Sequence, residues 1–166
     1  MNQQITFLKP ARSDVKGIYK LIQESKPLDL NSEYLYLLQS TYFSDTCIVA
    51  KLKDQIIGFV SGFISPKDKN LFFVWQLAVS KKHRGKGIAF LMLKELFSKD
   101  ILKNITTIHT TISPSNQESQ RVFEKFAALF EFDKEISIFA TKDDFNNSHE
   151  DELLYMMKPK INKGII

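Results

Sequence analysis

The chain has 166 residues, of which 43% are hydrophobic and 25% are charged, with one cysteine and a formal net charge of +4. These values fit a single globular domain over residues 1–166, and they exclude a disordered chain, a disulfide framework and a cysteine-held metal cluster. Because no apolar run approaches the roughly 20 residues that span a bilayer, and the first residues do not resemble a signal peptide, we expect a cytoplasmic protein with no membrane contact and no metal.

The first half of the chain predicts an edge strand, two helices and a hairpin. Residues 5–8 alternate between apolar and polar side chains like a short strand, and Ser13 has the position of a helix cap before an amphipathic segment. Residues 30–40 have the composition of a second helix. Residues 47–52 and 56–64 are typical of the two strands of a hairpin around a short polar turn.

An apolar strand followed by a basic glycine loop is the most informative feature. Residues 71–79 form an apolar run bounded by turn signals, which is typical of a buried strand. Gly85 and Gly87 precede an apolar helix, and Arg84 and Lys86 add positive charge. The free amides and the dipole of a helix N-terminus bind phosphate groups. Neither the dinucleotide fingerprint nor the P-loop pattern is satisfied, so the loop predicts a pyrophosphate site of another kind.

The remaining elements continue the alternation of strands and helices. Residues 105–112 are rich in β-branched side chains and predict a strand. Ser115 and Glu118 have the spacing of a capping box that opens a helix through Phe126. Two further strands are expected near residues 135–139 and 153–157, with a loop between them. The residues after Pro159 are expected to fray.

The pattern Arg84-x-x-Gly87-x-Ala89, after a strand ending in Leu77-Ala-Val79, resembles the GNAT superfamily of acyl-CoA N-acyltransferases. The order of elements resembles that superfamily over nearly the whole chain. The resemblance implies an α/β fold whose mixed sheet is splayed between its fourth and fifth strands and flanked by helices. It also implies acetyl-CoA as co-substrate, held between those strands. The implied cofactor-binding residues are Leu77, Ala78, Val79, Arg84, Gly85, Lys86, Gly87, Ile88, Ala89, Asn116 and Phe123.

Six segments resemble, more narrowly, the L-2,4-diaminobutyrate acetyltransferases of ectoine biosynthesis. They are residues 27–38, 46–47, 58–62, 73–76, 110–116 and 149–152. This resemblance implies that acetyl moves from acetyl-CoA to the γ-amine of a small diamino acid. It also implies a homodimer, because related acetyltransferases are often dimers.

A diamino acid carries two ammonium groups and one carboxylate, so its pocket needs acidic side chains. Asp29 is the first candidate for an ammonium anchor, with Tyr34 and Trp75 beside the aliphatic stem, and Glu150 or Glu152 offers a second carboxylate. Each has a structural alternative: Asp29 as a helix cap, Trp75 as a core residue, and the acidic run as an exposed loop. The substrate-binding residues implied are Asp29, Asn31, Tyr34, Trp75, Gln76, Thr111 and Glu150.

The reaction expected is direct attack by the amine, which must first lose a proton to a base. The candidates for this base are, in order, Glu150, Glu152, His149 and His109. The backbone N–H near Val79 is expected to bind the oxyanion. Many superfamily members protonate the leaving thiolate with a tyrosine, but Phe123 stands at that position here. Tyr34, Tyr36 or water then supplies the proton, or the thiolate leaves unprotonated.

Two other functions stay open at this stage. Another small-molecule or polyamine N-acetyltransferase would keep the cofactor loop but would not explain residues 29–36 and 149–152. A non-catalytic acetyl-CoA-binding module would bind CoA without turnover. Nucleic-acid binding is the least expected, because the positive charges form no stripe with interleaved aromatic side chains.

Overall fold

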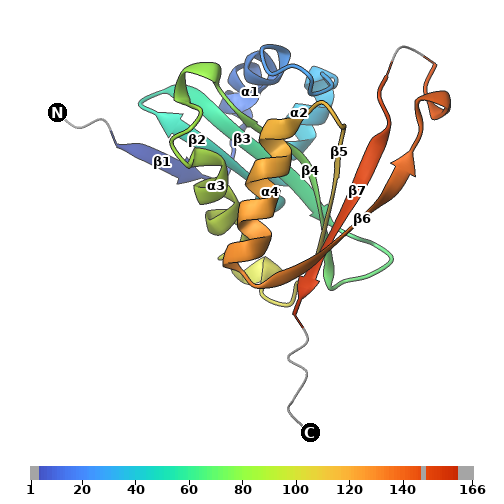
Figure 1. Ribbon diagram of the computed structural model, residues 1–166. Helices are drawn as coiled ribbons and strands as arrows, with labels where there is room; N and C mark the ends of the chain where they lie inside the picture. Colours follow the sequence, from blue (N-terminus) through green and yellow to red (C-terminus); the bar gives the residue numbers. More distant parts are fainter. Residues whose placement is uncertain (1–3, 147–148, 161–166) are drawn as a thin grey trace, which may run out of the picture.

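The computed structural model describes residues 4–146 and 149–160, which form a seven-stranded sheet flanked by helices (Figure 1). The strands are β1 (Ile5–Leu8), β2 (Cys47–Leu52), β3 (Gln55–Ile64), β4 (Leu71–Val79), β5 (Thr107–Ile112), β6 (Phe132–Ala140) and β7 (Glu152–Pro159). Their spatial order is β1-β2-β3-β4-β5-β7-β6. The pairing of β4 with β5 is parallel, and the other neighbouring pairs are antiparallel.

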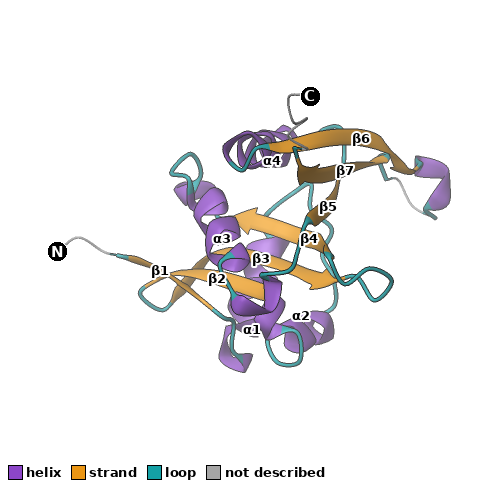
Figure 2. Cartoon of the chain, turned by 90° about the horizontal axis from the view of Figure 1, so that it is seen from below, coloured by secondary structure: helices purple, strands orange, loops and turns teal. Residues whose placement is uncertain are grey.

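Helices cover both faces of the sheet (Figure 2). They are α1 (Val15–Gln23), α2 (Glu33–Gln39), α3 (Ile88–Phe97) and α4 (Gln117–Leu129). Short 3-10 turns lie at Arg12–Asp14, Ser44–Thr46, Lys81–His83, Asp100–Leu102 and Lys142–Asp144. The core follows this division, because one cluster of buried side chains packs α1 and α2 on the sheet and another packs α3 and α4.

The predicted order of strands and helices is confirmed, but the predicted cap of the first helix and the predicted start of the second helix are wrong. Ser13 lies inside a 3-10 turn, and the buried carboxylate of Asp14 stands at the start of α1 instead. That carboxylate accepts the backbone N–H of Ala11 at 2.9 Å and pairs with Lys51 at 2.6 Å. The second helix begins at residue 33 rather than 30, because the hydroxyl of Ser32 caps it.

The capping box predicted at the start of α4 does not form either. Asn116 is the cap, and its side-chain oxygen accepts the N–H of Ser119 at 3.2 Å. The hydroxyl of Ser115 bonds to Glu150 instead, and the carboxylate of Glu118 pairs with Arg84. Both partners come from distant parts of the chain.

The predicted splay of the sheet is confirmed, and a bulge in β4 marks where it begins. Residues 71–74 of β4 pair with residues 107–110 of β5, and past that point the described strands form no further pairs with each other. Ser61 of β3 lies opposite Gln76, while Gly62 lies opposite Val74, so Trp75 is the extra residue of a β-bulge. Glycine is needed at position 62, because a Cβ there would lie 2.4 Å from the carbonyl oxygen of Phe73.

Four further features concern the membrane, metal binding, the single cysteine and the C-terminal residues. Within the described residues, no helix is long and apolar enough to cross a membrane, and no cluster of three or more His, Cys, Asp or Glu side chains is placed to hold a metal ion. Cys47 is buried, and burial raises the pKa of its thiol to about 12, which suits a small core residue. The fraying predicted after Pro159 concerns mainly residues 161–166, which lie outside the described part.

Candidate functional site

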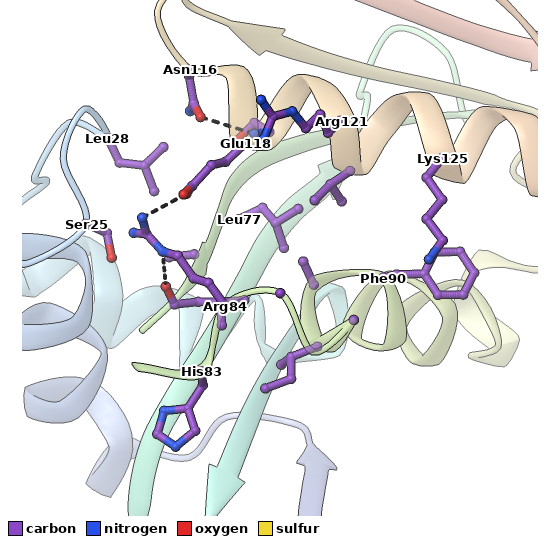
Figure 3. A pocket seen from close by; sticks show the side chains of 18 of the residues that line it. Ser25, Leu28, Leu77, His83, Arg84, Phe90, Asn116, Glu118, Arg121 and Lys125 are labelled. Atoms are coloured by element: carbon purple, nitrogen blue, oxygen red, sulfur yellow. Dashed lines mark hydrogen bonds and ion pairs between the residues drawn. The ribbon is translucent and has the colours of Figure 1, made fainter. Parts of the chain in front are cut away.

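A cleft of about 460 Å³ opens where β4 and β5 separate (Figure 3). The end of β4, the glycine loop and the start of α3 form one wall, and the first turns of α4 form the other. The predicted cofactor residues that line it are Leu77, Ala78, Val79, Arg84, Gly85, Gly87, Ile88, Ala89 and Asn116. All but Asn116 come from the continuous stretch 77–89, and the fold brings Asn116 to them from the start of α4.

The glycine loop presents an open backbone to this cleft. Gly85 and Gly87 both have a φ of +75°, which side chains with a Cβ rarely adopt, and a Cβ at either would meet no atom within 4 Å. Gly87 is the N-cap of α3, so the free amides of the first helical turn follow it directly. Cationic side chains line the same cleft, namely Lys26, Arg84, Arg121 and Lys125, together with the imidazole of His83. The cleft therefore suits a phosphate-bearing ligand such as coenzyme A.

Arg84 joins the two walls of the cleft. Its Nε donates to the carbonyl oxygen of Val79 at 3.0 Å, and its Nη1 lies 2.8 Å from Oε2 of Glu118 in the first turn of α4 (Figure 3). Nε and Nη1 of Arg84, two donors expected to bind a pyrophosphate, are thus bonded to protein groups. The guanidinium fixes the spacing between β4 and α4 as well as adding charge.

The end of β4 also directs backbone groups into the opening. Ser80 donates its N–H to the carbonyl of Ile57 in β3 at 2.8 Å. Because successive residues of a strand turn their N–H groups to opposite sides, the N–H of Val79 points away from β3, to the side where β5 has diverged. A donor in that place can bind a carbonyl oxygen that enters between the two strands.

Two predicted cofactor residues do not reach the cleft. Phe123 is 2% exposed and packs in the core cluster beneath α4, whereas its neighbour Val122 lines the cleft. The reason is the helical turn: α4 directs position 123 to the sheet and position 122 to the opening. Lys86 is exposed and lies outside the lining.

A second cavity, of about 600 Å³, adjoins the first and has an acidic lining. The two share Lys26, Pro27, Leu28 and Asn116 as lining residues, so they lie side by side. The predicted substrate residues in the second cavity are Asp29, Asn31, Trp75, Gln76, Thr111 and Glu150, together with the predicted catalytic residues His149 and Glu152. An acidic pocket thus opens beside an anion-binding cleft.

His149 contacts two acidic side chains of the second cavity. Its Nε2 lies 3.0 Å from Oδ2 of Asp29 and 3.9 Å from Oε1 of Glu152, and its ring stacks on Phe145 at 3.9 Å between centroids. A hydrogen bond with the backbone carbonyl of Glu150, followed by the one with Asp29, raises the pKa of His149. Asp29 does not cap α2, because Ser32 does, and the carboxylate of Asp29 contacts His149 in the pocket instead.

The two glutamates of the acidic run play different parts. Oε2 of Glu150 accepts the hydroxyl of Ser115 at 2.5 Å and lies 3.4 Å from the backbone N of that residue, which ties the loop to the start of α4. Glu152 has a side chain only 18% exposed, and its burial raises the pKa of the carboxyl group, against a hydrogen bond with Thr111 and the charge of His149.

Two of the predicted catalytic or substrate residues lie elsewhere. Tyr34 is 68% exposed on α2 and lines neither cavity, because α2 buries positions 36 and 39 instead. His109 pairs with Phe73 and Met156 across its neighbouring strands and also lies outside both linings. Trp75 is not a core residue: it lines the cavity at 45% exposure, with Phe63 edge-on at 6.3 Å.

Several residues that build the site were given no role in it from the sequence. Pro27 and Leu28 line both cavities, and Ser115 and Phe145 hold the loop that carries the acidic residues. The signal for Ser115 was present, since it stands between two residues of a matched segment. Phe145 carries no local signal, because its contact with His149 depends on how the loop folds back.

These features define an acyl-CoA-dependent acetyltransferase, and comparison with known proteins agrees. The model of the Acetyltransferase (GNAT) family matches residues 15–128. The chain belongs to this family. Solved structures with low sequence identity share the fold; one is Ard1 from Thermoplasma volcanium, 16% identical with a TM-score of 0.74 over 95% of this chain and 99% of that one.

Within the family, the similar proteins are L-2,4-diaminobutyric acid acetyltransferases. The one from Vibrio parahaemolyticus is 42% identical over 93% of this chain and 86% of its own length, and the one from Marinococcus halophilus is 39% identical over 93% and 90%. The structure of the diaminobutyrate acetyltransferase of Paenibacillus lautus, solved with its substrate L-2,4-diaminobutyric acid and coenzyme A, is 35% identical. It superposes with a TM-score of 0.93 over 98% of this chain and 99% of that chain.

Proposed function

We propose that this enzyme transfers the acetyl group of acetyl-CoA to the γ-amine of L-2,4-diaminobutyrate. The products are N4-acetyl-L-2,4-diaminobutyrate and CoA, and the reaction is a step of ectoine biosynthesis. One observation carries the proposal: an acidic cavity with Asp29, Glu150 and Glu152 lies beside the cationic cleft at the split between β4 and β5. An acceptor with two ammonium groups and a polyanionic donor each find a complementary wall.

The acidic side chains of the second cavity explain how the diamino acid would bind. The carboxylates of Asp29 and Glu152 both approach Nε2 of His149, at 3.0 and 3.9 Å, so an ammonium group entering beside that nitrogen meets both. Trp75 offers an exposed aromatic face for cation–π contact with the same group. Asn116 and Lys26 line both cavities and are placed near the point where acceptor and donor meet.

Glu152 is the general base in this proposal. The amine must be neutral to attack the thioester carbon, and a base whose pKa is raised by burial takes up the proton more readily at neutral pH. Glu150 is bound by Ser115 and instead holds the loop in place. His149, whose Nε2 approaches both Asp29 and Glu152, is placed to pass a proton onward.

The remaining steps fall to the end of β4 and to solvent. The N–H of Val79 binds the oxyanion that forms when the amine nitrogen bonds to the acyl carbon. The carbon–sulfur bond then breaks, and the CoA thiolate leaves. Tyr34 lies outside both cavities and Phe123 carries no proton, so water protonates the thiolate, which at an ordinary thiol pKa of about 8.5 also leaves readily unprotonated.

Thiol release from acetyl-CoA tests this function. The purified protein is assayed with L-2,4-diaminobutyrate, ornithine, lysine, spermidine and no amine. We expect diaminobutyrate to give the highest kcat/KM. Turnover on the other amines alone would assign the enzyme to a different acceptor, and CoA binding without any turnover would make the chain a binding module.

A homodimer in the cytoplasm completes the proposal. β6 is the last strand of the sheet and exposes Ile136, Ile138 and Phe139, at 48%, 65% and 60%. Exposed apolar edge strands pair with a second copy around a two-fold axis. Light scattering on the wild type and on Ile138→Lys checks this, with a monomer expected for the variant. The cytoplasm follows from the intracellular acyl donor.

A further inference from the structure

A buried hydrogen-bond chain links α2, the bulge of β4 and the loop that carries Asp29. The hydroxyl of Tyr36 donates to Oε1 of Gln76 at 3.2 Å, and Nε2 of Gln76 donates to the backbone carbonyl of Asp29 at 2.7 Å. The backbone N–H of Asn31 donates to the Tyr36 hydroxyl at 3.2 Å. The chain therefore holds the 29–31 loop from both ends.

The middle of this chain is closed to solvent. Tyr36 is 0% exposed and Gln76 is 5% exposed. The ring of Tyr36 is fixed edge-on by Tyr19 at 6.2 Å and by Phe59 at 6.3 Å between centroids. Because buried polar groups without partners are costly, each group in the chain depends on the next.

This chain of hydrogen bonds ends at Asp29, whose side chain is largely exposed to solvent. The carboxylate side chain of Asp29 is 73% exposed, and its one side-chain partner in the described residues is His149. Its backbone, in contrast, is tied to Gln76. The backbone of Asp29 is therefore held in place by the buried amide of Gln76, while its carboxylate contacts His149.

We propose that Tyr36 and Gln76 are positioning residues that aim Asp29 at the acceptor amine and so determine affinity for the diamino acid. This deepens the proposed function and rests on it. Gln76 then acts through its two protein partners rather than as a direct substrate ligand. Tyr36 is not the acid for the thiolate, because its hydroxyl hydrogen is committed to Gln76.

The test removes the hydroxyl of Tyr36 and compares the kinetics of this variant with those of a matched control variant. Tyr36→Phe breaks both bonds of the hydroxyl, whereas Tyr19→Phe makes the same chemical change on the ring that packs beside it. We expect the KM for diaminobutyrate to rise about tenfold in Tyr36→Phe, about 1.4 kcal/mol for the two hydrogen bonds lost, with kcat and the Kd for CoA within about twofold of wild type. Tyr19→Phe should leave KM unchanged.

A double-mutant cycle separates positioning from general loosening. If Tyr36 acts through Asp29, the effect of Tyr36→Phe on KM disappears when Asp29 is already Asn. Equal effects in both backgrounds, or an unchanged KM in Tyr36→Phe, would overturn the proposal. Gln76→Met provides a second variant if Tyr36→Phe fails to fold, and it should raise KM in the same way.

Hydrogen exchange keeps this inference distinct from the proposed function. The amide of Asn31 should exchange about tenfold faster in Tyr36→Phe than in wild type, whatever amine the enzyme acetylates. Unchanged exchange would remove the basis of the inference. Faster exchange with no turnover of diaminobutyrate in the wild type would instead place the fault in the acceptor assignment, with the positioning chain retained.

Discussion

Asp29 and His149 lie 120 residues apart in sequence, yet Nε2 of His149 is 3.0 Å from Oδ2 of Asp29 in the acidic cavity. A protonated imidazole and an ammonium group make the same demand on a carboxylate. Asp29 in the free enzyme therefore holds an internal cation where the proposed substrate brings its own. Four predictions start from this pair and from the cleft beside it.

Asp29→Asn removes the charge that both cations need while keeping the shape of the side chain. We expect the KM for diaminobutyrate to rise about 10- to 100-fold, the range for losing one charge-assisted hydrogen bond. The KM for acetyl-CoA should stay the same, because Asp29 does not line the cofactor cleft. Steady-state kinetics with each substrate varied in turn measure both values, and an unchanged KM for diaminobutyrate would remove Asp29 from the acceptor site.

The same pair makes stability depend on pH. The pKa of His149 is raised from 6.5 by its bond with the Glu150 carbonyl and by Asp29, so the folded state holds this proton more tightly than the unfolded chain. The stabilisation is fully present below pH 6.5 and is lost as the pH rises through the raised value. Urea midpoints from pH 5 to 9 should show this loss in wild type and lack it in His149→Gln.

Glu152→Gln removes the proposed base with no change in size. We expect kcat to fall about 10²- to 10³-fold, typical of a lost general base, with little change in the Kd for CoA. In the wild type, kcat/KM should fall as the pH drops through the raised pKa of Glu152, because the protonated carboxyl cannot accept a proton. Glu150→Gln is the matched control; a larger loss there than in Glu152→Gln would exchange their roles.

Gly87→Ala tests the phosphate cradle. Alanine at a φ of +75° costs about 1 kcal/mol of stability, and its methyl group would project into the open space that the ligand needs. We expect a weaker Kd for CoA by about tenfold or more, with the KM for diaminobutyrate nearly unchanged. Calorimetric titration with CoA measures this, and unaltered affinity would mean that the phosphates bind elsewhere.

The sequence predicted the cofactor cleft well because its signals are local. The run from Leu71 to Ala89 contains a strand, a glycine turn and a helix start in unbroken order; β4 has the bounds that the pattern indicated, and α3 begins directly after Gly87. A backbone site of this kind depends on φ angles and helix ends, which short stretches of sequence determine.

The sequence was weaker wherever a side chain chooses between a near and a distant partner. Ser115 and Glu118 have the spacing of a capping box, but Glu150 and Arg84 approach from elsewhere in the fold and bind them instead. Phe123 and Tyr34 line neither cavity for a related reason: the face that a helix turns to a cleft depends on tertiary packing. Spacing along one element does not contain that information.

One measurement tests the central claim most directly: NMR of the product formed from acetyl-CoA and L-2,4-diaminobutyrate by the wild-type enzyme. We expect one product, with the acetyl group on the γ-nitrogen, because in the proposed arrangement the acidic cavity presents that amine to the cleft. Acetyl on the α-nitrogen, a mixture of both products, or no acetylated diaminobutyrate would contradict it.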